Sequence, residues 1–125
     1  MCDFSKISSR LEEFSRLKDG WNEGEGNPFD LLSLKKLSQC FSLNYPEYMP
    51  QPHIYPDLDD VIRFEWEFGK SHVDLDVNIL NLKSTIYSYN LETDEVTEEQ
   101  SDLNKGTFWK VLESVISNAM VRGNV

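Results

Sequence analysis

The alternation of apolar and polar positions is clearest in the middle of the chain, where it predicts three strands. Apolar residues occupy every second position over residues 61–68 and 72–79, and a similar alternation follows over residues 84–91. A period of two residues is typical of antiparallel strands with one buried face and one face in water. Residues 69–71 and 81–83 interrupt the alternation with residue types that suit turns.

Apolar residues spaced three or four positions apart predict a helix at the start of the chain. Its apolar stripe consists of Phe4, Ile7, Leu11, Phe14 and Leu17. Asp3 is the expected N-cap, because its carboxylate can accept hydrogen bonds from the first free backbone amides. Gly20 suits the position just after the helix, where the backbone often turns left-handed.

Two further helices are expected on the same grounds. Asn27 followed by Pro28 predicts the start of the second helix, with Asp30 near its positive dipole end and its last residues near Asn44. The third helix has an apolar stripe over residues 108–120 and is followed by glycine. Between the helices and the strands, the proline-rich residues 45–56 predict an extended connector, with a short strand at residues 53–55 as an option.

Together these elements predict an α+β fold. We expect three helices packed on one face of a three- to four-stranded antiparallel meander, in the order α-α-β-β-β-α. The acidic residues 92–105 are expected to form a mobile loop. With 125 residues, of which 39% are hydrophobic, the chain is expected to form a single domain over residues 1–125.

Acidic residues gather in the middle of the chain. The sequence has 22 Asp and Glu against 12 Lys and Arg, a formal net charge of -10, and residues 57–102 alone contain 13 acidic and 3 basic residues. A chain this acidic is repelled by phosphate backbones and anionic lipids, which argues against nucleic-acid and membrane partners. No export signal or membrane-spanning run is apparent, so we expect a cytoplasmic protein.

No residue pattern points to a cofactor, a metal or a catalytic group. Cys2 and Cys40 have no Cys-x-x-Cys partner, so the sequence predicts neither a metal nor a redox motif. Ser71, His72 and Asp74 are too close together in one strand to form a catalytic triad. Glu65 and Glu67 share a strand face, but no cleft around them is predicted.

The expected strand register places four carboxylates on the wet face of the sheet. If Phe68 faces Val73 in the core, then Glu67 lies opposite Asp74 and Glu65 lies opposite Asp76. In the third strand, Thr85 would lie opposite Ile79, which would place Ser88 and Asn90 beside the aspartates. Like charges directly opposite each other destabilise a sheet, so a patch of this kind suggests a use.

That use is predicted to be the docking of a basic surface on a partner protein, with Glu65, Glu67, Asp74 and Asp76 as the binding residues. A non-enzymatic interaction module of the antitoxin, immunity-protein or inhibitor type fits the small size and the acidity. Three alternatives stay open at this point. The acidic face could serve a metal-dependent or carboxylate-based enzyme, it could be a solvated face without a partner, or the chain could be a structural homo-oligomer such as a homodimer.

Two short motifs resemble those of known sequences. The first is the loop Gly20-Trp21-Asn22-Glu23-Gly24-Glu25-Gly26, followed by Asn27-Pro28, and the second is Ile62-Arg63-Phe64-Glu65-Trp66. Together they resemble small uncharacterised bacterial proteins in which a G-W-[DN]-G-x-G-A-like loop precedes an L-E-W-like strand. The chain differs at Glu23, where that pattern has glycine, and at Gly26, where it has alanine. The resemblance implies a bacterial protein and structural roles for both motifs, and it transfers no catalytic residue.

Overall fold

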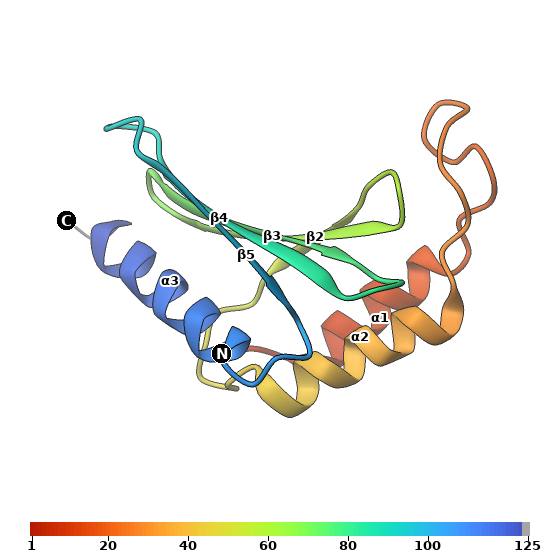
Figure 1. Cartoon of the computed structure of the whole chain (residues 1–125), viewed down its shortest axis with the longest axis horizontal. Coiled ribbons are helices and arrows are strands. Elements are labelled where there is room, and N and C mark those ends of the chain that lie inside the picture. Colours follow the sequence, from red (N-terminus) through yellow and green to blue (C-terminus); the bar gives the residue numbers. More distant parts are fainter. Residues whose placement is uncertain (124–125) are drawn as a thin grey trace.

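The computed structural model describes residues 1–123 as three helices and one five-stranded antiparallel sheet (Figure 1). The helices are α1 (Phe4–Phe14), α2 (Leu31–Asn44) and α3 (Phe108–Gly123). The strands are β1 (His53–Pro56), β2 (Val61–Phe68), β3 (Ser71–Asn78), β4 (Lys83–Asn90) and β5 (Val96–Asp102), and they lie side by side in chain order. The predicted α+β class is confirmed, whereas the sheet has five strands in place of the expected three or four.

All three helices lie on one side of the sheet (Figure 1). Phe41 of α2 stacks on Phe64 of β2 with 4.4 Å between the ring centroids. The same ring meets Trp109 of α3 edge-on at 5.0 Å, so one phenylalanine joins two helices to the sheet. Burial of each such ring contributes roughly 1.5–3 kcal/mol. The buried apolar residues form one continuous core between the helices and the sheet.

Both N-terminal helices begin at an aspartate. Asp3 caps α1 and accepts a hydrogen bond from the Ser5 amide at 3.0 Å, as predicted. Asp30 caps α2 and accepts from the amide and the hydroxyl of Ser33, so α2 starts at Leu31 and the expected start at Asn27 and Pro28 is wrong. These bonds satisfy amides that otherwise lack a partner, and each cap typically contributes about 1 kcal/mol.

The glycine-rich segment between α1 and α2 is a small hairpin. The Gly20 amide donates to the Gly26 carbonyl at 2.8 Å, and both glycines have positive φ. Because α1 already ends at Phe14, with Ser15 as its C-cap, Gly20 belongs to this hairpin and does not follow the helix directly. The Trp21 indole donates to the Asn27 carbonyl at 3.0 Å and packs against Phe29. Trp21 therefore connects the hairpin to Phe29, just ahead of α2.

The register of β2 and β3 differs from the expected one by two residues. Phe68 pairs with Ser71, so the turn consists of Gly69 and Lys70 only. Gly69 has a φ of +58°, and two-residue hairpin turns favour glycine at such positions. The tighter turn replaces the expected pairing of Phe68 with Val73. A shift of two residues leaves each side chain on its predicted face but gives it a new partner.

The outer strands β4 and β5 differ from the prediction in two further ways. Thr85 pairs with Asp76 and not with Ile79, which turns β4 over. Ile86 therefore lies in the core, and Ser88 and Asn90 leave the face on which the aspartates lie. Residues 96–102 form the edge strand β5, although a loop was expected there. Backbone pairing with β4 holds this strand in place. Its side chains are mostly polar, so their pattern in the sequence does not indicate a strand.

The proline-rich connector is tied to the core by Trp66. The indole nitrogen of this buried residue donates to the Tyr45 hydroxyl at 3.1 Å and to the Pro50 carbonyl at 3.2 Å. The connector then leads into β1, which confirms the short strand allowed for at residues 53–55.

Candidate functional site

The face of the sheet turned away from the helices has no helix or strand over it within the part of the chain described (Figure 1). We call it the open face. Strand pairing arranges most of its side chains in three cross-strand rows, beyond which Val61 pairs with Asn78 and Lys83 pairs with Asp102. The rows are His53–Glu65–Asp74–Tyr87–Glu98, Tyr55–Arg63–Asp76–Thr85–Gln100 and Glu67–His72–Tyr89–Val96.

All four predicted binding residues belong to the open face, but their partners differ from the expected ones. Glu65 lies opposite Asp74, and this is the one like-charged pair among the four. Glu67 lies opposite His72, with 3.8 Å between its Oε1 and the histidine Nδ1. The two predicted like-charged pairs, Glu67 with Asp74 and Glu65 with Asp76, are therefore wrong. The cause is the two-residue turn after Phe68.

Asp76 forms a two-pronged ion pair with Arg63. The Arg63 Nε lies 2.7 Å from Oδ1, and Nη2 lies 2.9 Å from Oδ2. Parallel hydrogen bonds of this kind fix both side chains and are stronger than those between neutral groups. The pair neutralises the charge of Asp76, so this residue contributes less negative potential than the sequence predicted.

Asp74 is a buried carboxylate on a face that is otherwise open to water. Only 8% of its surface is exposed. Burial raises its pKa, and the neighbouring Glu65 raises it further, while Arg63 acts in the opposite direction. Within residues 1–123, no ion pair within 4 Å and no side-chain hydrogen bond joins Asp74 to another group. Its charge therefore lacks the compensation that Asp76 receives.

Two shallow hollows flank Arg63 on the open face. The first, of about 300 Å³, is lined by Arg63, Asp74, Tyr87, Tyr89, Asn90, Leu91, Asp94 and Val96. The second, of about 320 Å³, is lined by Tyr55, Pro56, Asp57, Arg63 and Glu65. Tyr89 is held in place by stacking on His72, with ring centroids 5.0 Å apart and planes 12° apart. Aromatic rings thus lie beside carboxylates in both hollows.

Acidic turns stand at both ends of the open face. Asp57, Asp59 and Asp60 belong to the β1–β2 turn, and Glu92, Asp94 and Glu95 belong to the β4–β5 turn. In Figure 1 both turns rise on the side away from the helices. The two acidic turns therefore lie at opposite ends of the open face, and their negative potentials add to that of its own carboxylates.

Sequence reasoning missed the tyrosines of this face. Tyr87 and Tyr89 were expected on the same side as the core residue Ile79, whereas β4 turns them outwards. Tyr55 was not assigned to any surface, although its place in the second row leaves it 44% exposed. The feature that could have found them is Ile86, because it alternates with the tyrosines and fits the core better than they do.

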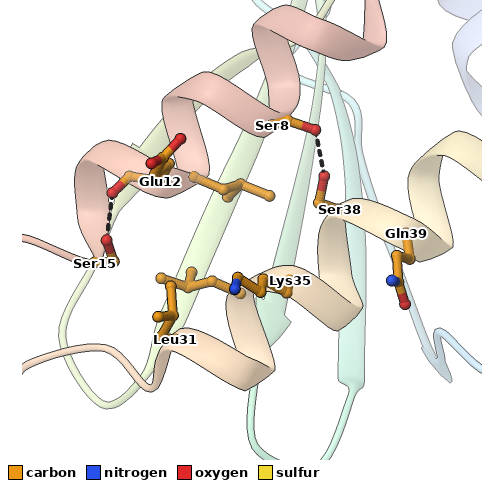
Figure 2. Close-up of a pocket in the computed structure, with 9 residues that line it drawn as sticks. Ser8, Glu12, Ser15, Leu31, Lys35, Ser38 and Gln39 are labelled. Carbon is orange, nitrogen blue, oxygen red and sulfur yellow. Dashed lines mark hydrogen bonds between the residues drawn. The ribbon is translucent and has the colours of Figure 1, made fainter.

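A larger groove of about 420 Å³ lies between α1 and α2 (Figure 2). Ser8 and Ser38 face each other across it, with 2.7 Å between their hydroxyl oxygens. The Ser15 hydroxyl donates to the Glu12 carbonyl at 2.6 Å, as Figure 2 shows. These serines are committed to hydrogen bonds within the protein, and the lining includes no histidine or cysteine. The groove therefore offers no arrangement that suggests catalysis.

The described residues contain no cluster of metal-binding side chains. Within residues 1–123, no three His, Cys, Asp or Glu side chains come close enough together to hold a metal ion. Burial raises the pKa of both the Cys2 and Cys40 thiols, which disfavours the reactive thiolate.

None of the helices in the described range is long and apolar enough to span a membrane. Comparison of the chain with known protein families, with curated proteins and with solved structures found no match.

Proposed function

We propose that this protein is a non-enzymatic interaction module whose open face docks a basic surface of a partner protein. The observation that supports the proposal is the concentration of carboxylates on that face. Its three rows contain Glu65, Glu67, Asp74, Asp76 and Glu98 and a single guanidinium, that of Arg63. Since Arg63 is already paired with Asp76, the remaining carboxylates give the face a negative potential.

The residue types of the open face also favour protein binding. Tyrosine and arginine are enriched in the residues that dominate binding energy at protein interfaces. Tyr55, Tyr87 and Tyr89 provide apolar area together with a polar hydroxyl, and Arg63 is fixed between them by Asp76. A basic partner would be attracted over a distance by the acidic turns and then held by contacts with these rings. A neutralising role, as in an antitoxin, immunity protein or inhibitor, is the concrete form of the proposal.

The test compares two variants with the same change in net charge. One carries Glu65→Gln, Glu67→Gln and Glu98→Gln on the open face. The control carries Asp19→Asn, Glu23→Gln and Glu25→Gln, three exposed residues at and beside the glycine-rich hairpin. Proteins captured by the wild type from extracts of the expressing cells are purified, and their affinity for all three forms is measured at low and high salt.

The proposal expects a basic partner that binds the wild type and the control alike and the open-face variant roughly tenfold or more weakly. Added salt should weaken the first two complexes and reduce the difference between variants. Equal affinity of all three forms for every captured protein would reject the open face as the docking surface.

A homodimer built through the sheet edge is the competing proposal. β5 is an edge strand with free backbone groups on one side, which could pair with a second copy. β5 carries Glu98, Glu99 and Asp102 and no basic residue, so pairing of two copies along this edge would bring like charges together, and their repulsion opposes it. Light scattering at low and high salt distinguishes the two, because an edge dimer should be favoured by salt whereas a complex with a basic partner is weakened by it.

A further inference from the structure

We propose that the hollow beside Asp74 on the open face receives one arginine side chain of the partner, with its guanidinium against the Asp74 carboxylate. This inference rests on the proposed function and specifies its partner at the level of a single side chain. It follows from three features of the hollow: a buried carboxylate at its base, aromatic and apolar walls, and a neighbouring arginine that is already engaged.

Asp74 supplies the charge that the arginine would meet. The residue is more than nine-tenths buried, yet it lines the hollow. It faces Glu65 across the strand pair, so its carboxylate is partly desolvated and is also repelled by a neighbour. An incoming cation relieves both penalties, because it replaces lost hydration and balances the two carboxylates.

Arg63 cannot play that part itself. It also lines the hollow, but its Nε and Nη2 are both bonded to Asp76 at less than 3 Å. To serve Asp74, the guanidinium would have to give up this two-pronged contact. The hollow therefore keeps a carboxylate for which the described part of the chain supplies no direct ion-pair partner.

The walls of the hollow favour arginine over lysine. Tyr87 and Tyr89 line the hollow from the open face of β4, and Val96 of β5 lies opposite Tyr89. The aliphatic stem of a long side chain can lie against these rings while its charged end reaches inward. A guanidinium is planar and weakly hydrated, so it stacks on tyrosine and tolerates a half-buried site better than an ammonium does. A volume of about 300 Å³ leaves room for one such side chain.

The test uses N-acetylarginine amide, which carries one guanidinium and no other charge. The probe is titrated into the full-length protein while the NMR signals of the Tyr87 and Tyr89 rings and of the Asp74 carboxyl carbon are followed. We expect saturable shifts of these signals, with a Kd on the order of millimolar for so small a ligand. Nα-acetyllysine amide, which keeps its side-chain ammonium, should bind more weakly. Nα-acetylcitrulline amide, which is similar in shape to the arginine probe but uncharged, should not bind.

Two variants connect the response to the proposed residues. Asp74→Asn removes the charge with little change of shape and should weaken the probe at least tenfold. Tyr87→Leu removes one wall and should weaken it by a similar factor, and it keeps the test decisive if the first variant folds poorly. Glu12→Gln, on α1 in the helical layer, is the matched control and should bind as the wild type does.

Three results would overturn the assignment: no saturable shift in the wild type, an equal response in Asp74→Asn and in the wild type, or binding of the lysine or citrulline probe as strong as that of arginine. These outcomes are distinct from failure of the proposed function. A partner could still require Glu65, Glu67 and Glu98 while this hollow stays empty, and the probe could bind the hollow even if no basic partner is found.

Discussion

Glu65 and Asp74 lie directly opposite each other on β2 and β3, so two carboxylates face one another across the strand pair. Five other groups surround Asp74: Tyr87 directly opposite it on β4, Arg63 and Asp76 in the neighbouring row, and His72 and Tyr89 on the other side. Burial and Glu65 raise the pKa of Asp74 more than Arg63 and His72 lower it. The structure thus retains a carboxylate whose ionisation opposes folding.

The first prediction concerns Asp74→Asn and pH. Because the pKa of Asp74 is higher in the folded protein, the folded state binds more protons than the unfolded chain just above the ordinary aspartate pKa of 3.8. Stability is therefore lost as the pH rises through this range. At pH 7 the variant should be more stable than the wild type by roughly 0.2–1 kcal/mol.

Urea unfolding at several pH values checks this prediction. The advantage of Asp74→Asn should shrink as the pH is lowered and vanish below the ordinary aspartate pKa, where the wild-type residue is neutral in both states. A variant less stable than the wild type at pH 7 would mean that the carboxylate makes a favourable contact in the folded protein.

The second prediction is that Asp76→Asn has the opposite sign. Asp76 lies only two residues further along β3, but its carboxylate accepts two hydrogen bonds from Arg63. The side chains are 36% exposed for Arg63 and 20% for Asp76, so the pair is partly screened by water. Its loss should destabilise the protein by about 1 kcal/mol, less at high salt.

Glu98→Gln is the control for this comparison, because Glu98 is an exposed residue of the same face with no ion pair within 4 Å in the described chain. Its substitution should change the free energy of unfolding by less than about 0.5 kcal/mol. If Asp74→Asn and Asp76→Asn shift stability in the same direction, the distinction drawn between the two aspartates is wrong.

The helices and the central strands could be predicted from the sequence because their apolar side chains repeat with a fixed period. The stripe of α1 has its buried residues Ile7, Leu11 and Phe14 where the spacing placed them. Likewise, Phe64 and Trp66 of β2 are buried while Glu65 between them is not. Periodicity reports which face of an element is buried, and that information is local.

The partners of these residues could not be predicted in the same way. A shift of two residues between β2 and β3 leaves every face unchanged, so alternation cannot distinguish Phe68–Val73 from the observed Phe68–Ser71. The choice depends on the turn at Gly69, whose positive φ allows a two-residue connection. For this reason the acidic face was predicted, whereas the ion pair of Arg63 with Asp76 was not.

The predictions for the outer strands β4 and β5 were wrong for other reasons. In β4, Thr85, Tyr87 and Tyr89 were placed on the core face because tyrosine is compatible with a buried position, although Ile86, which alternates with them, fits the core better. In β5, a polar segment became a strand because β4 offered it free backbone groups. Such pairing is non-local and leaves no periodic trace. The tyrosine-lined hollow lies where these two errors meet, so it could not have been predicted.

The third prediction separates two glycines of the hairpin between α1 and α2. Gly24 and Gly26 have nearly the same φ, +93° and +97°. A Cβ on Gly24 would meet nothing within 4 Å, whereas a Cβ on Gly26 would lie 2.5 Å from the Trp21 indole nitrogen. Gly24→Ala should cost roughly 1–2 kcal/mol through backbone strain alone.

Gly26→Ala should cost about 1–3 kcal/mol more, because the methyl group forces Trp21 out of its place against Phe29. Thermal unfolding measures both variants, and tryptophan fluorescence should change for Gly26→Ala more than for Gly24→Ala. Equal effects of the two substitutions would show that Trp21 can move without cost and does not fasten the hairpin.

The last prediction concerns the hydrogen bonds of Trp66. Its indole nitrogen donates to the Tyr45 hydroxyl and to the Pro50 carbonyl, which ties the connector to β2 inside the core. Trp66→Phe removes this donor and part of the ring, so it should cost about 2–4 kcal/mol. Tyr45→Phe should cost less, since it removes one hydroxyl whose own bond goes to Pro50 at 2.6 Å.

A double-mutant cycle isolates the direct contact between the two side chains. The two residues share a hydrogen bond, and their ring centroids lie 6.1 Å apart. The double variant should therefore be less destabilised than the sum of the single variants, by about 0.5–1.5 kcal/mol. Chemical denaturation of the four proteins supplies the values. Additive losses would show that the indole and the Tyr45 hydroxyl are not coupled, and the hydrogen bond from the indole to the Pro50 carbonyl would then be its remaining polar tie to the connector.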